Sequence, residues 1–295
     1  MKKMVIDEAF LSELESLQTI LKNNVAGMFG GNRRSKNFGS SCEFADYRDY
    51  VPGDDITKID WNAYARFDKL YEKLYFDERQ MHTRIYIDAS RSMNHGADSE
   101  KAEQAIRIAA AFAYLSICEM DKVSIYAIHG AQLEEVVSGM VGKDSYIGCI
   151  NKLNEIEFDA DAKISQAIVP SAVGRGDGFS IIISDYLTEE NFEDAVDRLC
   201  DQKRDVLCIQ ILSREEINPQ IRGKMHLFDS ELPEQYFRKK IDQNVVRAYK
   251  DALKYVTDRI RLYCESRGAQ YLFVPAYASM SDVFFGNLVD LEVLK

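Results

Sequence analysis

A run of short oxygen-bearing side chains follows an apolar stretch near residue 88. Asp88, Ser90 and Ser92 are spaced two residues apart, directly after the apolar residues 85–87. Such apolar runs are typical of buried parallel strands, and open α/β sheets bind ligands beyond the carboxyl ends of their strands. Carboxylate and hydroxyl oxygens favour Mg²⁺, Mn²⁺ or Ca²⁺ over zinc. The pattern therefore predicts a divalent-metal site, although Asp and Ser also occur in ordinary turns and helix caps.

A second carboxylate follows another apolar run further along the chain. Residues 179–184 read Phe-Ser-Ile-Ile-Ile-Ser, and Asp185 comes directly after them. If both runs are strands of one parallel sheet, Asp185 lies at the same carboxyl edge as Asp88. This second strand strengthens the prediction of a metal site.

The rest of the chain alternates predicted strands with predicted helices. Strands are expected at residues 85–87, 123–128, 135–141, 179–184, 206–212, 225–228 and 270–274, and helices at residues 99–121, 146–153, 164–172, 190–202 and 245–264. This order predicts an α/β fold with a Rossmann-like, mainly parallel sheet and helices on both faces. The turn after residue 88 lacks the glycine-rich fingerprint of dinucleotide-binding proteins, which argues against dinucleotide binding.

An amphipathic helix is predicted ahead of these elements. Its apolar residues recur at helical spacing from residue 10 to residue 28, and glycines follow at residues 30 and 31. Its opposite face carries acids instead of basic residues, which favours docking onto its own domain over binding a membrane surface or a partner. We therefore expect residues 1–82 to form an N-terminal helix with a small β-containing extension, and residues 83–295 to form the α/β domain.

The segment at residues 43–78 is dense in aromatic and acidic residues, and residues 70–76 alternate as a strand would. Asp54, Asp55 and Asp60 could be catalytic. We expect instead that they bond turn backbone or pair with neighbouring basic residues, because acids in turns commonly do so. Trp61 is expected to be largely buried.

Composition limits the class of protein and its partners. The chain has 295 residues, of which 46% are hydrophobic and 29% charged, as in an ordinary folded protein. A net charge of −11 argues against nonspecific binding to nucleic acid, whose phosphates attract basic surfaces. The six cysteines are scattered, and no secretion signal or membrane-spanning run is evident. A cytoplasmic protein with reduced cysteines is expected.

These motifs resemble those of two known families. The four oxygen-bearing residues described above resemble the metal-ion-dependent adhesion site of von Willebrand factor A domains. Pro-Gly-Asp-Asp at residues 52–55 and Ile-Asp-Trp at residues 59–61 resemble bacterial proteins that carry the domain of unknown function 58. The resemblance implies a von Willebrand A-like domain and an interaction role with no established reaction. It also implies association with a MoxR-type AAA+ ATPase.

One motif of the adhesion site is altered in this chain. Such sites take a Thr from a middle loop, but no Thr occurs between Thr83 and Thr188. Asp159, Asp161 and Ser165 lie nearest the expected place, and we take Asp161 as the candidate ligand. An Asp there should hold Mg²⁺ more firmly and reduce its attraction for a partner's carboxylate. A metal-free site stays open as the alternative.

The main alternative function is a Mg²⁺-dependent phosphatase or phosphotransferase that uses Asp88 as its nucleophile. Haloacid-dehalogenase-like phosphatases carry a second Asp two residues later, which protonates the leaving group, whereas this chain has Ser90. It also lacks the His-Glu-x-x-His and Gly-x-Ser-x-Gly motifs. A non-enzymatic interaction module is therefore the predicted function.

Overall fold

The structure is a computed structural model that describes residues 6–7, 10–16, 44–75, 80–94, 100–171, 178–188, 191–220, 223–228 and 236–287. The chain divides into two compact units. The larger contains Met1–Thr19 and Met81–Val293, and the smaller contains Ile20–Gln80 with Leu294–Lys295. The domain boundary expected after residue 82 lies close to this junction. Residues 10–16, however, group with the larger unit instead of the smaller one.

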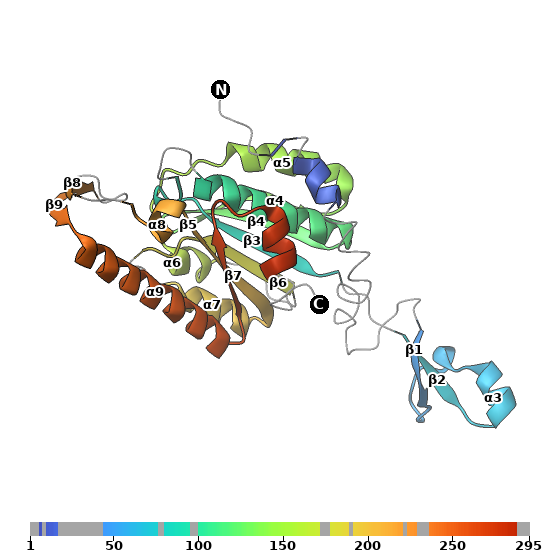
Figure 1. Ribbon diagram of the computed structural model, residues 1–295. Coiled ribbons are helices and arrows are strands. Elements are labelled where there is room, and N and C mark those ends of the chain that lie inside the picture. Colours follow the sequence, from blue (N-terminus) through green and yellow to red (C-terminus); the bar gives the residue numbers. More distant parts are fainter. Residues whose placement is uncertain are drawn as a thin grey trace. The chain divides into compact units, whose positions relative to one another are not determined.

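A six-stranded sheet forms the centre of the larger unit, in the order β10-β7-β6-β3-β4-β5 (Figure 1). Its strands are β3 (His82–Asp88), β4 (Lys122–His129), β5 (Gln132–Met140), β6 (Gly178–Ser184), β7 (Arg204–Leu212) and β10 (Gln270–Pro275). Neighbouring strands pair in parallel, except that β5 is antiparallel to β4. This topology confirms the predicted α/β fold with a mainly parallel sheet.

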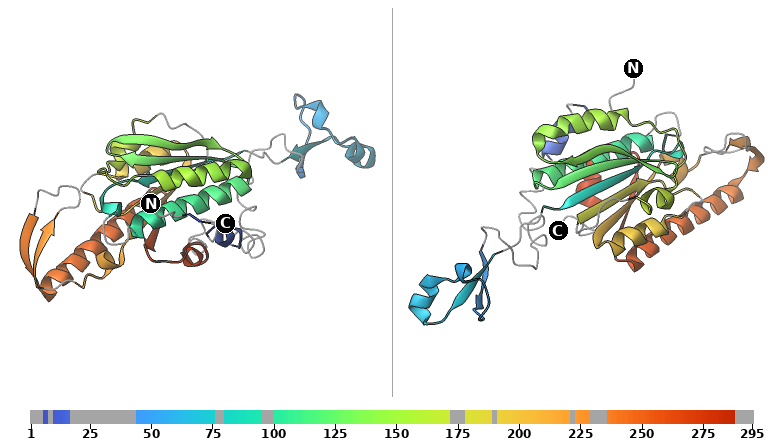
Figure 2. Two further views of the ribbon diagram at one scale, coloured as in Figure 1. Left: turned by 90° about the horizontal axis from the view of Figure 1, so that it is seen from above. Right: turned by 180° about the vertical axis from the view of Figure 1, so that it is seen from behind.

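Helices cover both faces of this sheet (Figures 1 and 2). One face carries α4 (Glu100–Cys118) and α5 (Tyr146–Glu155), and the other carries α6 (Ile164–Ile168), α7 (Glu193–Asp201) and α9 (Gln243–Ser266). The central strands are consequently buried on both sides, and residues 85–87 and 181–183 are 0% exposed. A strand enclosed in this way needs a continuous apolar run, which is why those runs could be recognised in the sequence.

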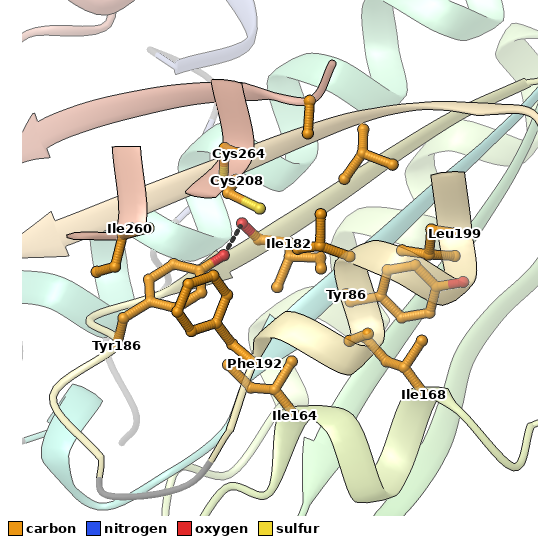
Figure 3. Close-up of a cluster of buried hydrophobic side chains, with 14 of the residues drawn as sticks. Tyr86, Ile164, Ile168, Ile182, Tyr186, Phe192, Leu199, Cys208, Ile260 and Cys264 are labelled. Atoms are coloured by element: carbon orange, nitrogen blue, oxygen red, sulfur yellow. Dashed lines mark hydrogen bonds between the residues drawn. The ribbon is translucent and has the colours of Figure 1, made fainter. Parts of the chain in front are cut away.

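The core beneath α6, α7 and α9 is shown in Figure 3. Tyr86 and Ile182 project into it from β3 and β6, and Ile260 and Cys264 enter it from α9. The buried hydroxyl of Tyr186 donates a hydrogen bond to the Ile182 carbonyl oxygen at 3.2 Å. This contact ties the loop after β6 back onto its own strand, close to the candidate site.

The described part of the N-terminal helix docks onto the larger unit. Phe10 and Leu14 lie on its apolar face and are 5% and 1% exposed. Just ahead of the helix, the backbone N–H of Ile6 donates to Asn154 Oδ1 on α5 at 3.2 Å. Docking onto its own domain, as the acidic outer face indicated, is therefore confirmed for residues 10–16. The remainder of the predicted helix lies outside the described residues.

Several elements differ from those predicted. The sequence did not indicate β9 (Tyr236–Ile241), which pairs antiparallel with β8 (Gly223–Phe228). The helix expected at residues 164–172 ends at Ile168, and a short helix, α8 (Arg214–Ile217), follows β7. Among the described residues, no helix combines the length and the apolar character needed to cross a bilayer.

The smaller unit contains β1 (Phe44–Asp49) paired antiparallel with β2 (Tyr71–Tyr75), a short helix at Ile56–Lys58, and α3 (Trp61–Phe67). Its acids have structural partners. Asp55 and Asp60 accept backbone N–H groups at the starts of these two helices, and Asp54 pairs with Arg48 at 2.9 Å. The expectation that these acids bond turn backbone or pair with basic residues is confirmed.

The expectation that Trp61 is buried was wrong. Its side chain is 62% exposed. Trp61 is the first residue of α3, and no residue of this helix is buried. We expect Trp61→Ala to change the free energy of unfolding by no more than about 0.5 kcal/mol, as at other exposed positions. Ile59, which is 7% exposed, is the matched control, and Ile59→Ala should cost about 2 to 4 kcal/mol. Thermal unfolding of both variants checks this, and a larger loss for Trp61→Ala would contradict the exposed position.

Candidate functional site

Asp88 is the last residue of β3 and lies at the carboxyl edge of the sheet. The neighbouring strand β6 ends at Ser184, so Asp185 emerges at the same edge. Ser184 Oγ donates to Asp88 Oδ2 at 2.5 Å, and the Ser90 N–H donates to Asp88 Oδ1 at 2.9 Å. Asp88 and Asp185 are each 2% exposed. Burial and the negative charge of Asp185 raise the pKa of Asp88 to about 6.

The two serines that follow Asp88 lie close together in the loop after β3. Ser90 Oγ and Ser92 Oγ are 2.9 Å apart and share a hydrogen bond. Ser92 begins a short helical turn, Ser92–Asn94, in which the Met93 N–H donates to the Ser90 carbonyl oxygen at 3.2 Å. Met93 itself is 0% exposed and anchors the turn in the core. The loop therefore presents one carboxylate and two hydroxyls from the same short segment.

The middle loop runs beside this segment, in the place expected for the altered motif. Ser90 pairs with Ala160 in a parallel bridge, and the Arg91 Nε donates to the Asp159 carbonyl oxygen at 2.6 Å. Asp161 is exposed, and no described contact joins its side chain to Asp88 or to the two serines. Ser165 Oγ accepts the Ala195 N–H at 3.1 Å, which ties α6 to α7. Ser165 therefore has a packing role.

Sequence reasoning missed a buried lysine at this edge. Lys101 lies in the first turn of α4, is 1% exposed, and donates through Nζ to Asp185 Oδ2 at 2.8 Å and Glu216 Oε1 at 2.6 Å. Burial alone would lower the pKa of Lys101, but the two carboxylates outweigh this effect and raise it. The available signal was a lysine in the first turn of a helix whose middle is apolar on nearly every side. The sequence analysis also did not single out Ser184, which lies directly before Asp185.

The residues at β3 fit a hard cation. Asp88 is a buried carboxylate, and among the described residues no basic side chain contacts it, so its charge lacks a counter-charge at close range. Buried charges are normally paired or coordinate a metal. No group of three or more His, Cys, Asp or Glu side chains suited to a metal occurs in the described part of the chain. An ion here would therefore depend on Asp88 together with the hydroxyls of Ser90 and Ser92, which are oxygen ligands of the kind Mg²⁺ accepts.

The sequence matches one protein family model and several uncharacterized relatives over most of its length. The model of the family described as "Protein of unknown function DUF58" matches residues 46–257. The uncharacterized protein Rv1480 of Mycobacterium tuberculosis is 24% identical over 229 residues, which cover 76% of this chain and 72% of the relative. The uncharacterized protein Mb1516 of Mycobacterium bovis matches with the same identity and coverage.

Solved structures similar to this chain include von Willebrand A domains. The VWA domain of SpRpn10 has a TM-score of 0.38 and 11% identity, over 70% of this chain and 94% of that domain. A von Willebrand factor type A protein from Catenulispora acidiphila has a TM-score of 0.30 and 11% identity, over 66% of this chain and 43% of that one. These TM-scores are low, so the fold class rests on the strand order of the sheet.

Proposed function

This chain belongs to the DUF58 family, whose name carries no activity, and we propose from its site that it is a non-enzymatic protein-interaction module with a divalent-ion site. The observation that supports the proposal is the meeting of Asp88, Ser90 and Ser92 at the carboxyl edge of the sheet, beside the loop that carries Asp185. The partner we propose is a MoxR-type AAA+ ATPase or its client, during the assembly or activation of protein complexes.

The proposed ion ligands suggest how the site would contact a partner protein. Asp88, Ser90 and Ser92 would hold the ion, and positions of its coordination shell that they leave open can accept an oxygen of a partner's Asp or Glu. A carboxylate bound in this way contributes a charge-assisted contact that is sensitive to the identity of the partner. Because Ser90 and Ser92 sit on one short turn fixed by Met93, the site is held in place before the partner arrives.

The enzymatic alternative has less support. Ser90 stands where an acid would be needed to protonate a leaving group. A screen of generic phosphate esters with Mg²⁺ tests this alternative, and turnover that Asp88→Asn abolishes would replace the interaction proposal.

The proposal predicts that Asp88 is needed for both ion and partner binding. Titration calorimetry with Mg²⁺ or Mn²⁺ should give a binding heat for the wild type and none for Asp88→Ala. Asp251→Ala, which removes an exposed acid from α9, serves as the matched control and should behave as wild type. In interferometry with the candidate ATPase, Asp88→Ala and EDTA should each weaken binding.

The outcomes separate the parts of this proposal. If Asp88→Ala leaves the heat of ion binding unchanged, the ion does not bind at Asp88. Equal affinity for the ATPase with wild type, Asp88→Ala and EDTA-treated protein would rule out an ion-bridged contact. Absence of binding by the wild type would rule out this ATPase as the partner. Asp161→Ala tests the middle loop, since a loss of ion affinity would identify Asp161 as the ligand that replaces the missing Thr.

A further inference from the structure

Lys101 forms a buried ion cluster at the carboxyl edge of the sheet. Its side chain is 1% exposed, and its ammonium lies 2.8 Å from Asp185 and 2.6 Å from Glu216. Lysine is almost never fully buried unless it is paired, because removing an ammonium from water is costly. The two carboxylates therefore hold this positive charge inside the protein.

Both carboxylates are also fixed by local backbone groups. Asp185 Oδ1 accepts the Leu187 N–H at 3.0 Å. Glu216 Oε2 accepts the Ser213 N–H at 2.8 Å, within the capping box of α8. Each carboxylate thus places one oxygen on Lys101 and the other on a backbone N–H. Both oxygens of Asp88 also accept hydrogen bonds, but among the described residues no basic side chain contacts Asp88, whereas Asp185 is paired with Lys101.

The first turns of α4 join the loops that follow three strands. Lys101 connects α4 to the loop after β6 and to α8 after β7. Gln104, three residues later, donates through Nε2 to the Ala278 carbonyl oxygen at 3.1 Å, in the loop after β10. Because a buried ammonium cannot leave its carboxylates without a large cost, these contacts tie the three loops to α4.

We infer that the Lys101 ammonium neutralises Asp185 permanently, so that these loops stay assembled without a divalent ion. Any bound divalent ion is then held through Asp88, Ser90 and Ser92 instead of Asp185. This departs from the resemblance to metal-ion-dependent adhesion sites, in which the residue matching Asp185 belongs to the metal motif. The statement about bound ions rests on the proposed function. The statement about the loops is independent of it.

The loop statement is tested by thermal unfolding in EDTA. Lys101→Met leaves the buried Asp185 and the partly exposed Glu216 without their cation, and should lower the melting temperature by about 5 to 15 °C. Lys254→Met, at an exposed position of α9, is the matched control and should shift it by about 1 °C or less. Adding Asp185→Asn to Lys101→Met should restore part of the loss, because one unpaired charge is removed. A Lys101→Met protein that melts with the control would overturn the inference.

A second variant decides the matter if Lys101→Met does not fold. Asp185→Asn alone should lower the melting temperature equally in EDTA and in Mg²⁺, because its partner is Lys101. A drop seen only in Mg²⁺ would make Asp185 a ligand and overturn the inference.

The ion statement is tested by Mn²⁺ titration. Asp88→Asn should weaken Mn²⁺ binding by more than about 10-fold, and Asp185→Asn by less than that. Equal losses of Mn²⁺ affinity in the two variants would overturn the statement about bound ions. If the wild type binds no Mn²⁺, both the proposed ion site and the statement about bound ions are wrong. The melting experiments still decide the role of Lys101 in that case.

Discussion

Replacing Ser184 with Ala is expected to lower the free energy of unfolding by about 2 to 4 kcal/mol, although it removes only one oxygen atom. The Ser184 side chain is 0% exposed. Its hydroxyl donates to Asp88 Oδ2 at 2.5 Å and accepts the Tyr186 N–H at 2.9 Å. The substitution leaves a buried carboxylate oxygen and a buried N–H without partners, and each of these is costly to bury alone.

Chemical denaturation measures this loss, and two comparisons interpret it. Ser145→Ala removes an exposed hydroxyl that also bonds backbone carbonyl oxygens, and should cost about 0.5 kcal/mol or less. In an Asp88→Asn background, Ser184→Ala should cost about 1 to 3 kcal/mol less than in the wild type, because the charged acceptor is gone. A cost that is the same in both backgrounds would show that the bond to Asp88 is not the source.

Replacing Met93 with Ala is expected to destabilise the protein by about 2 to 5 kcal/mol. Met93 is 0% exposed and lies inside the turn that carries Ser92. Its removal leaves a cavity below the loop and frees the turn that holds the two serine hydroxyls. We therefore expect faster amide hydrogen exchange at residues 90–94 as well as a lower free energy of unfolding.

Two substitutions serve as controls for Met93→Ala. Met93→Leu keeps nearly the same volume and should cost less than about 1.5 kcal/mol. Met120→Ala makes the same chemical change at a side chain that is 63% exposed, and should cost about 0.5 kcal/mol or less. If Met93→Ala were as mild as Met120→Ala, the turn would not depend on this anchor, and its two hydroxyls would need another support.

The smaller unit shows where local patterns stop being informative. The sequence indicated a strand near residues 70–76, and the structure has β2 at Tyr71–Tyr75. It also indicated structural roles for the acids, because an acid that caps a helix acts on backbone only two or three residues away. The burial of Trp61, by contrast, depends on what covers α3, and among the described residues α3 buries none of its side chains.

The sequence by itself determined the class of fold and the position of Asp88 and Asp185 at strand ends. Both follow from local rules, since a strand buried on both faces must be a continuous apolar run and parallel strands end at one edge. Only the tertiary structure decided which charges meet there. Lys101 reaches Asp185 and Glu216 across 84 and 115 residues of chain. Periodicity cannot reveal such contacts, because they depend on how helices and loops pack over the finished sheet.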